Sequence, residues 1–418
     1  MASAKPGIPY SMDMDSEKAR QLVENGGTLL LLQVPQGTAI GIDHQVFLSG
    51  PKFCGVKMLP PGPHLLTYYA IGSSGTLAAP TSRWVVLHAK QVVVLRWQPE
   101  AELLEELPDE DERERYALGA RRFDFDSGLA PYNLSAFPVW KLLAADVSQR
   151  TLDRLLPPCL NTSVTAEARP PAASSAAEAR LDEQLRSGAG PMDVEQAPGT
   201  SGPDGEGSRR QSSSVGSCSF TALPLRVSGE GLTPEQLTAA NMDKSAALDS
   251  LIRDQYDGDE RELLAEFQTA FLNFVLGHSL QAYAQWKDFL VLVCSCAQAI
   301  SPRHGRSGLI CSFAKTLRVQ LQVTLEAEAS TPSGMMGDAT PFGVPMVEEL
   351  LAASFLRPLL GGWLEDIQDP AAEVEPDLRQ EGRRIRDLLA KRLGMDLAAD
   401  ELSAGDQGDE YAPVIVET

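Results

Sequence analysis

The second half of the chain is organised around residues 263–290, which read LLAEFQTAFLNFVLGHSLQAYAQWKDFL. In its first part, apolar side chains recur at steps of three and four residues, which places them on one buried face of a helix. They are Leu263, Leu264, Phe267, Phe271, Phe274 and Val275, and after Gly277 the pattern resumes with Tyr283, Trp286, Phe289, Leu290 and Val293. We predict two consecutive helices and interpret Phe267, Phe271, Trp286 and Leu290 as packing residues rather than partner contacts.

Helical periodicity extends on both sides of this stretch, over residues 219–397. The predicted helices are 234–255, 260–277, 279–299, 308–328, 346–366 and 376–394. Thr233 and Pro234 suit the cap and first turn of the first helix, because proline is tolerated where no amide donor is needed. Residues 330–345, rich in Gly, Pro and Thr, are interpreted as a loop insertion. This region is expected to be an all-α bundle.

The first 162 residues are predicted to form a β-rich N-terminal domain. Short apolar, β-branched or aromatic runs are bounded by Gly, Pro, Asn or Ser, as strands are by turns. These runs are 28–34, 38–42, 65–70, 84–88 and 92–97. Because only Pro35-Gln36-Gly37 separates the first two runs, we expect them to form a hairpin. After Glu100 the pattern becomes helical, so the domain should be a small sheet or sandwich followed by helices.

A rigid connection is indicated by GPKFCGVKMLPPGPHLLTYYA, residues 50–70. Prolines fix φ and glycines permit tight turns, so Pro60-Pro61-Gly62 should direct the chain into a strand. Lys52, Phe53 and Lys57 precede that turn. They suit either surface contacts or a scaffold turn.

Residues 163–218 are predicted to be a disordered linker. They are mostly Ala, Ser, Gly, Pro and Glu without aromatic side chains, so they cannot bury enough apolar area to offset their ordering entropy. Within them, Arg209 and Arg210 precede Ser212, the arrangement that basophilic kinases favour. Ser212 is therefore a candidate phosphorylation site, the alternative being a solvated serine without a role.

Residues 398–418 are interpreted as an acidic tail that carries one strand, Val414-Ile415-Val416. No neighbouring hairpin partner is present in the sequence. A lone strand must pair with a sheet edge, on its own protein or on another.

The chain has 418 residues and a formal net charge of −21. Residues 100–114 hold nine acidic residues and one arginine, and residues 396–418 hold seven acidic residues and no lysine or arginine. This charge repels nucleic-acid phosphate, so direct nucleic-acid binding is not expected. Apolar runs are shorter than the ~18–20 residues that span a bilayer. With six scattered cysteines and no apolar signal core, we expect a soluble intracellular protein.

No catalytic constellation is visible, and we predict neither enzymatic activity nor a cofactor. Cys294 and Cys296 point away from each other on a helix and suit the core better than a metal site. Gly72-Ser73-Ser74-Gly75 suits a hairpin turn, and Asp257-Gly258-Asp259-Glu260 suits a turn that caps a helix.

Two alternative functions stay open at this level. The first is a metal-dependent enzyme in the β-rich domain that uses His44, His64 or His88, although no His-x-His or His-Glu spacing supports it. The second is RNA binding through Arg121-Arg122, Arg383-Arg384 and Arg386, which are more typical of a solvated helix face.

Residues 50–70 closely resemble a signature of the A1-cistron splicing factor family, the assembly factors of the U5 small nuclear ribonucleoprotein. Further stretches agree with that family: GTAIGID (37–43), residues 263–290, APVIVE (412–417) and, more weakly, GLAPYN (128–133) with Trp140. The resemblance covers both domains and the tail in the same order. The long linker and the insertion at 330–345 depart from the family pattern.

This resemblance implies an α+β protein of two domains, with an all-α, VHS-like C-terminal domain, that acts as a non-enzymatic assembly chaperone in pre-mRNA splicing. Family members bind the large core protein of the U5 particle through its RNase H-like and MPN-type domains and hold off the particle's RNA helicase. Their tail adds a strand that bridges both partner domains. The residues that match this tail are Tyr411, Pro413, Val414, Ile415 and Val416. Lys52, Phe53 and Lys57 are candidate contacts in the N-terminal domain.

Overall fold

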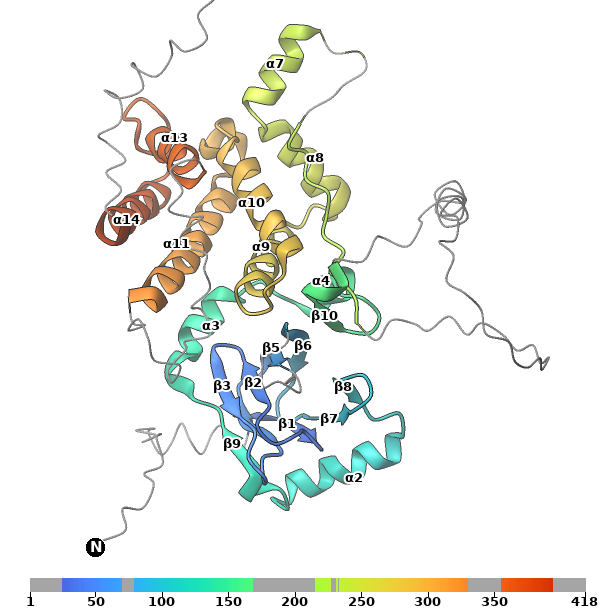
Figure 1. Cartoon of the computed structure of the whole chain (residues 1–418). Helices are drawn as coiled ribbons and strands as arrows, with labels where there is room; N and C mark the ends of the chain where they lie inside the picture. Colours follow the sequence, from blue (N-terminus) through green and yellow to red (C-terminus); the bar gives the residue numbers. More distant parts are fainter. Residues whose placement is uncertain are drawn as a thin grey trace, which may run out of the picture.

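The computed structural model describes residues 25–69, 79–167, 215–226, 231, 233–329 and 355–393. Two sheets with associated helices form the N-terminal region, and helices form the C-terminal region (Figure 1). The predicted α+β class with a β-rich region followed by a helical one is confirmed. Among the described residues, no helix is both long and apolar enough to cross a membrane.

The N-terminal region is built from two five-stranded sheets. The first has the order β8 (Leu103–Glu106), β7 (Val92–Gln98), β1 (Gly27–Leu32), β4 (Gly55–Leu59) and β9 (Leu129–Pro131). The second has the order β10 (Asn161–Ser163), β6 (Thr81–Leu87), β5 (Gly62–Tyr69), β2 (Ala39–Ile42) and β3 (Gln45–Leu48). Leu29 and Leu31 of the first sheet pack against Ile40, Leu66 and Tyr68 of the second. The sequence-based expectation of a sandwich therefore holds.

The predicted hairpin between residues 28–34 and 38–42 is wrong, because β1 and β2 lie in different sheets. β1 pairs in parallel with β7 and antiparallel with β4, whereas β2 pairs with β3 and β5. The consecutive leucines of β1 are buried on both faces: Leu31 faces the sandwich interior, and Leu30 packs with Val94 on the outer side. Such a run lacks the alternation that would indicate a one-sided hairpin strand.

A second correction concerns the residues after Glu100, where strand β8 precedes helix α2. The helix α2 (Glu110–Arg121) begins with an Asp109 cap and covers the outer face of the first sheet, where Tyr116 contacts the apolar cluster. The chain then continues through η1 (Asp126–Gly128), η2 (Leu134–Ala136), α3 (Phe137–Leu143), α4 (Gln149–Leu155) and α5 (Val164–Glu167).

In its described residues, the C-terminal region contains helices and no strand of a sheet. Its elements are α7 (Pro234–Met242), α8 (Ser245–Gln255), α9 (Glu260–Val275), α10 (Leu280–Cys294), η3 (Gln298–Ile300), η4 (Pro302–His304), α11 (Ser307–Ala329), α13 (Leu356–Gln368) and α14 (Pro376–Leu393). The predicted helix 234–255 is two helices, because the chain leaves helical geometry at Asp243 and its side chain caps the second helix. The predicted caps Thr233 and Asp259 are confirmed.

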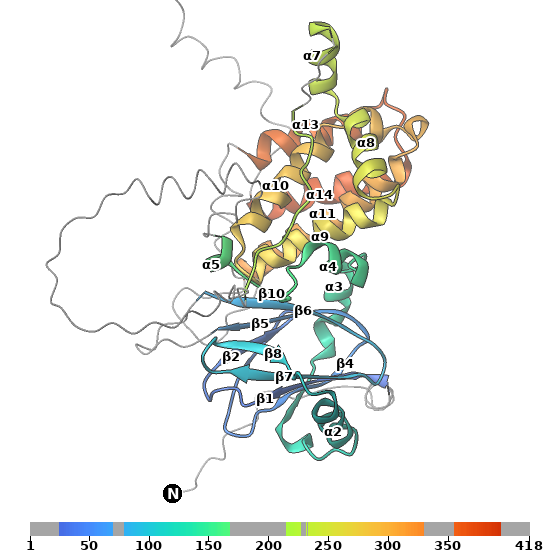
Figure 2. The same ribbon diagram turned by 90° about the vertical axis from the view of Figure 1, so that its right-hand side faces the viewer.

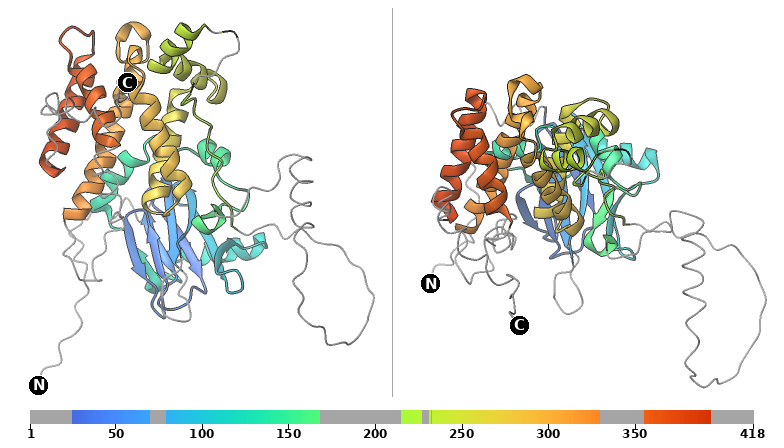
Figure 3. Two further views of the ribbon diagram at one scale, coloured as in Figure 1. Left: turned by 45° about the horizontal axis from the view of Figure 1, so that its top comes forward. Right: turned by 90° about the horizontal axis from the view of Figure 1, so that it is seen from above.

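The layers of the molecule follow one another in the order α2, first sheet, second sheet and helical region (Figure 2). Figure 3 shows the red helices α13 and α14 beside the orange α11, with the yellow-green α7 and α8 on the opposite side. Helix α9 lies at the junction, and every residue from Glu262 to Val275 is buried. One apolar cluster extends from Leu65 and Trp84 of the second sheet through α9 to Leu389 of α14. The two regions therefore share a continuous core.

The two ends of the predicted linker lie side by side at this junction. Thr162 and Gly216 form a parallel bridge, and the Gly216 amide donates to the Asn161 carbonyl at 2.9 Å. The Glu167 carboxylate accepts the Leu280 amide at 3.0 Å, which satisfies a free donor at the start of α10. The chain leaves and re-enters the fold at one place, so the intervening residues do not set the spacing of the two regions.

Replacement of residues 168–214 with a short Gly/Ser connector is expected to shift the melting temperature by less than about 3 °C, because all contacts among the described residues are kept and loop-closure entropy varies slowly with length. Differential scanning calorimetry of the full chain and the shortened chain measures this shift. The matched control replaces residues 215–226 with Gly/Ser of equal length and removes contacts to β10 and α9, so it should melt much lower. Equal melting temperatures for the two replacements would contradict this assignment.

Candidate functional site

Three motifs of the N-terminal domain meet in one buried hydrogen-bond network around Asp43. The Oδ2 atom of Asp43 accepts from His64 Nδ1 at 2.7 Å and from the Tyr132 hydroxyl at 2.7 Å. Its Oδ1 atom accepts from the Leu65 amide at 3.0 Å. Asp43 has φ 56° in the two-residue turn between β2 and β3, a conformation that aspartate tolerates better than most residues. The network therefore joins GTAIGID, the Pro60-Pro61-Gly62 connection and GLAPYN.

His64 is held as a cation by two acceptors. Its Nε2 atom lies 2.7 Å from the Pro60 carbonyl oxygen, while Nδ1 faces the Asp43 carboxylate. Because neither partner can donate, both ring nitrogens carry protons. Burial alone would lower the pKa of His64, but the Asp43 charge and the hydrogen bonds to Asp43 and Pro60 outweigh it and raise that pKa. No nitrogen of this ring is left to act as a base or a metal ligand.

The other residues considered for a metal site do not donate or accept hydrogen bonds at Asp43. His44 is half-buried against the Tyr132 ring, and His88 is exposed after β6. Cys296 is buried, and burial raises the pKa of its thiol to about 12. In the part of the chain that the structure describes, no group of three His, Cys, Asp or Glu side chains is placed to hold a metal ion.

The three candidate contact residues of the N-terminal domain have different surroundings. Lys52 is exposed in the turn before β4. Phe53 is half-buried and stacks on Phe47 of β3, with ring centroids 6.3 Å apart. Lys57, in β4, forms an ion pair with Asp126. Lys52 thus has the most accessible side chain, whereas Phe53 and Lys57 also connect the turn to its neighbours.

Several sequence-predicted residues lie outside the described residues. They are Ser212, Gly72 to Gly75, residues 330–345 and the tail residues Tyr411, Pro413, Val414, Ile415 and Val416. Of the arginines considered for RNA, Arg121 forms an ion pair with Glu114 at 3.1 Å, and Arg384 forms one with Glu381 at 2.5 Å.

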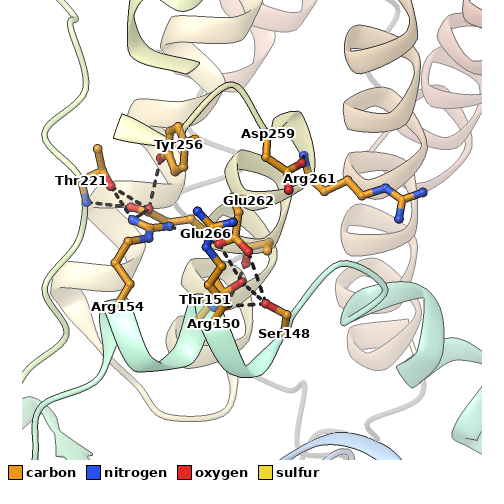
Figure 4. Close-up of polar contacts among 12 residues, drawn as sticks. Ser148, Arg150, Thr151, Arg154, Thr221, Tyr256, Asp259, Arg261, Glu262 and Glu266 are labelled. Carbon is orange, nitrogen blue, oxygen red and sulfur yellow. Dashed lines mark hydrogen bonds and ion pairs between the residues drawn. The ribbon is translucent and has the colours of Figure 1, made fainter. Parts of the chain in front are cut away.

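A second polar network joins α4 of the N-terminal region to α9 (Figure 4). Glu266 is fully buried and accepts five hydrogen bonds. The donors are Arg154 Nη1 at 2.7 Å, the Thr221 amide at 2.7 Å, the Thr221 hydroxyl at 2.8 Å, the Tyr256 hydroxyl at 3.1 Å and Gln285 Nε2 at 3.1 Å. One turn earlier, Glu262 accepts from Thr151 at 3.0 Å and Ser148 at 3.3 Å.

Two more polar side chains of α9 reach the N-terminal region. Gln268 exchanges two hydrogen bonds of 2.9 Å with the backbone amide and carboxylate of Asp146. Asn273 accepts the Trp84 indole N–H at 2.8 Å. These contacts orient α9 on the sheets and fix how the two regions sit together.

Sequence reasoning missed this network and also the roles of Asp43 and Tyr132. A usable signal was present in α9, because Glu262, Glu266 and Asn273 recur at helical spacing inside an otherwise apolar run. Charged side chains are rarely fully buried unless they are paired. Such a stripe indicates buried partners, although it does not identify them.

Comparison with known proteins places both regions in one family. A family model described as the AAR2 N-terminal domain matches residues 25–157, and one described as the AAR2 C-terminal repeat region matches residues 220–398. The chain is 30% identical over 409 residues to the Protein AAR2 homolog of Mus musculus, which covers 97% of each chain. It is 27% identical over 411 residues to that of Homo sapiens, again over 97% of each chain. The Caenorhabditis elegans homolog is 25% identical over 395 residues, or 91% of this chain and 97% of that protein.

The raised pKa of His64 makes its contribution to stability depend on pH. The contribution is fully present below the unfolded-state pKa of about 6.5 and is lost as pH rises through the higher folded-state pKa. We expect the free energy of unfolding of the wild type to exceed that of His64→Gln most at pH 6, with the difference shrinking above that value. Urea unfolding from pH 6 to pH 9 measures it.

The exposed His88 provides the matched control, since His88→Gln removes an imidazole outside the buried network. Its pH profile should follow that of the wild type. A difference between wild type and His64→Gln that stays constant across the range would rule out a buried cation.

Two arginines of α4 allow a buried ion pair to be compared with an exposed one. Arg154 pairs with the fully buried Glu266, whereas Arg150 pairs with Asp257 at 2.7 Å where both side chains are exposed. Arg154→Ala leaves a buried carboxylate without its cation and is expected to lower the free energy of unfolding by roughly 3 kcal/mol. Arg150→Ala should cost less than about 1 kcal/mol. Equal losses in guanidinium titrations would show that the buried pair has no special role.

Proposed function

The chain belongs to the AAR2, or A1-cistron splicing factor, family and is a splicing-related factor, and from this membership we propose that it is a non-catalytic assembly chaperone of the U5 small nuclear ribonucleoprotein. In this proposal it binds the large core protein of that particle through the RNase H-like and MPN-type domains. Occupying that surface holds off the particle's RNA helicase until maturation. We place this activity in the nucleus and cytoplasm.

One observation carries the proposal: both regions match their family models in order, and the relatives align over 97% of their length. The shared core supports it, because a rigid body presents its surfaces at fixed separation and loses less entropy on binding. Both ring nitrogens of His64 donate to buried acceptors, which supports a binding role rather than hydrolytic chemistry at that histidine.

For the tail, we propose that Val414, Ile415 and Val416 add a strand to a sheet edge of the partner. Main-chain hydrogen bonds supply affinity in this mode, and alternate side chains supply specificity. Tyr411 and Pro413 would set the approach to that strand. Lys52, Phe53 and Lys57 are the proposed contacts of the N-terminal domain.

Ser212 is the proposed regulatory site, because Arg209 and Arg210 precede it. A phosphate adds about 1.5–2 negative charges at pH 7, which would disfavour binding to an acidic surface or favour an arginine cluster. A phosphopeptide map of the cellular protein tests this assignment. Ser212 that is unmodified under all splicing-active conditions would remove it.

Deletion of Glu410–Thr418 is expected to weaken binding to the two partner domains by at least about tenfold while leaving the melting temperature unchanged, because it keeps every residue of the described shared core. Isothermal titration with the joined RNase H-like and MPN-type domains measures this loss. Equal affinity of the full-length and shortened chains would contradict the tail mechanism.

A point variant distinguishes the effect of main-chain pairing on binding from the effect of tail length. Ile415→Pro removes an amide donor inside the strand and should reproduce most of the loss. Asp406→Pro, in the same acidic segment but outside the strand, is the matched control and should bind like the wild type.

A further inference from the structure

A groove lies between helix α2 and strand β7, on the side of the N-terminal region away from the helical region (Figure 2). Its volume is about 280 Å³. One wall is the Val92–Val94 part of β7, and the other is the face of α2 that carries Glu110, Arg113 and Glu114. Val92 and Val93 are half-buried and Val94 is buried, so the β7 wall offers a small apolar surface, and the rim is charged.

The sheet edge is open along this groove. The Thr28 amide donates to the Gln91 carbonyl at 2.9 Å, so the backbone groups of Gln91 and, two residues on, Val93 face β1. Val92 and Val94 consequently direct their N–H and C=O groups away from β1, toward the groove. β8 begins its pairing with β7 only at Leu95. Within the described residues, the first half of β7 therefore has a strand neighbour on one side alone.

The charge of the groove is negative. It borders residues 100–114, which carry a net charge of −8 from nine acidic residues and one arginine. Two glutamates of the lining already have arginine partners: Glu106 pairs with Arg83 at 2.9 Å and Arg113 at 3.6 Å, and Glu114 pairs with Arg121 at 3.1 Å. Glu110 is exposed, and no described residue forms an ion pair with it. The excess negative charge attracts cations to this edge.

We propose that this groove binds an extended basic segment of a partner protein. The segment adds a strand at Val92–Val94, places an apolar side chain against Val92, and directs a lysine or arginine side chain at Glu110. Two competing occupants carry the wrong charge: nucleic acid is anionic, and the chain's own tail, residues 396–418, has seven acidic residues and no basic one. This docking site is independent of the proposed tail strand and of the identity of its partner.

Fluorescence anisotropy of the full chain with a labelled eight-residue peptide of alternating lysine and valine tests this site. Binding should weaken with added salt, and Glu110→Lys should weaken it by at least about fivefold. Glu100→Lys is the matched control, because it makes the same charge change within the acidic block but outside the groove, and it should weaken binding less than about twofold. Equal effects of the two variants, or no binding, would overturn the proposal.

Two further probes address strand addition. A peptide of alternating glutamate and valine should not bind, and the lysine peptide with alternate amides N-methylated should bind at least about fivefold more weakly, because its main-chain donors are blocked. Hydrogen exchange should slow at the Val92 and Val94 amides when the lysine peptide is present. Unchanged binding of the methylated peptide, or protection at the exposed β3 edge instead, would overturn the proposal.

Discussion

The interdomain arrangement depends on one buried charge, the carboxylate of Glu266. Its five hydrogen bonds come from three separate parts of the chain: α4, the segment before α7, and the helices around α9. Removing a partner from such a charge costs several kcal/mol, whereas an exposed pair contributes little. The two regions therefore cannot separate without exposing both an apolar core and an unsatisfied carboxylate. The contacts at the junction, rather than the length of the linker, set the relative position of the two regions.

The N-terminal domain applies the same principle on a smaller scale. The pairing of Asp43 with His64 ties the β2–β3 turn to the Pro60 connection, and Tyr132 adds the segment after β9. Phe47 of β3 stacks on Phe53, so the hairpin that carries this turn also contacts the loop of Lys52. Both networks thus hold the surfaces around them in fixed positions, and preorganised surfaces lose less entropy on binding.

What the sequence could predict follows from the range of each interaction. The buried face of α9 was predictable because helical spacing is local, and Phe267 and Phe271 lie in the core as expected. The partner of Glu266 could not be predicted, because Arg154 is 112 residues away in the sequence. The prediction of a β1–β2 hairpin was wrong because an apolar run that is buried on two faces does not indicate which strand it pairs with. Whether a residue such as Lys52 contacts a partner depends on a second molecule, which one sequence does not describe.

Most of the net charge of −21 comes from two segments, residues 100–114 and residues 396–418. In residues 100–114, Glu106 of β8 pairs with Arg83 of the second sheet, and Glu112 of α2 pairs with Arg96 of the first sheet, so part of this charge connects these elements. Residues 396–418 contain no basic side chain, so nothing within that segment can neutralise it. Exposed charges are screened beyond about 8 Å at physiological ionic strength, whereas partly buried pairs are screened less. Salt should therefore weaken any steering by the tail well before it loosens the ion pairs of the fold.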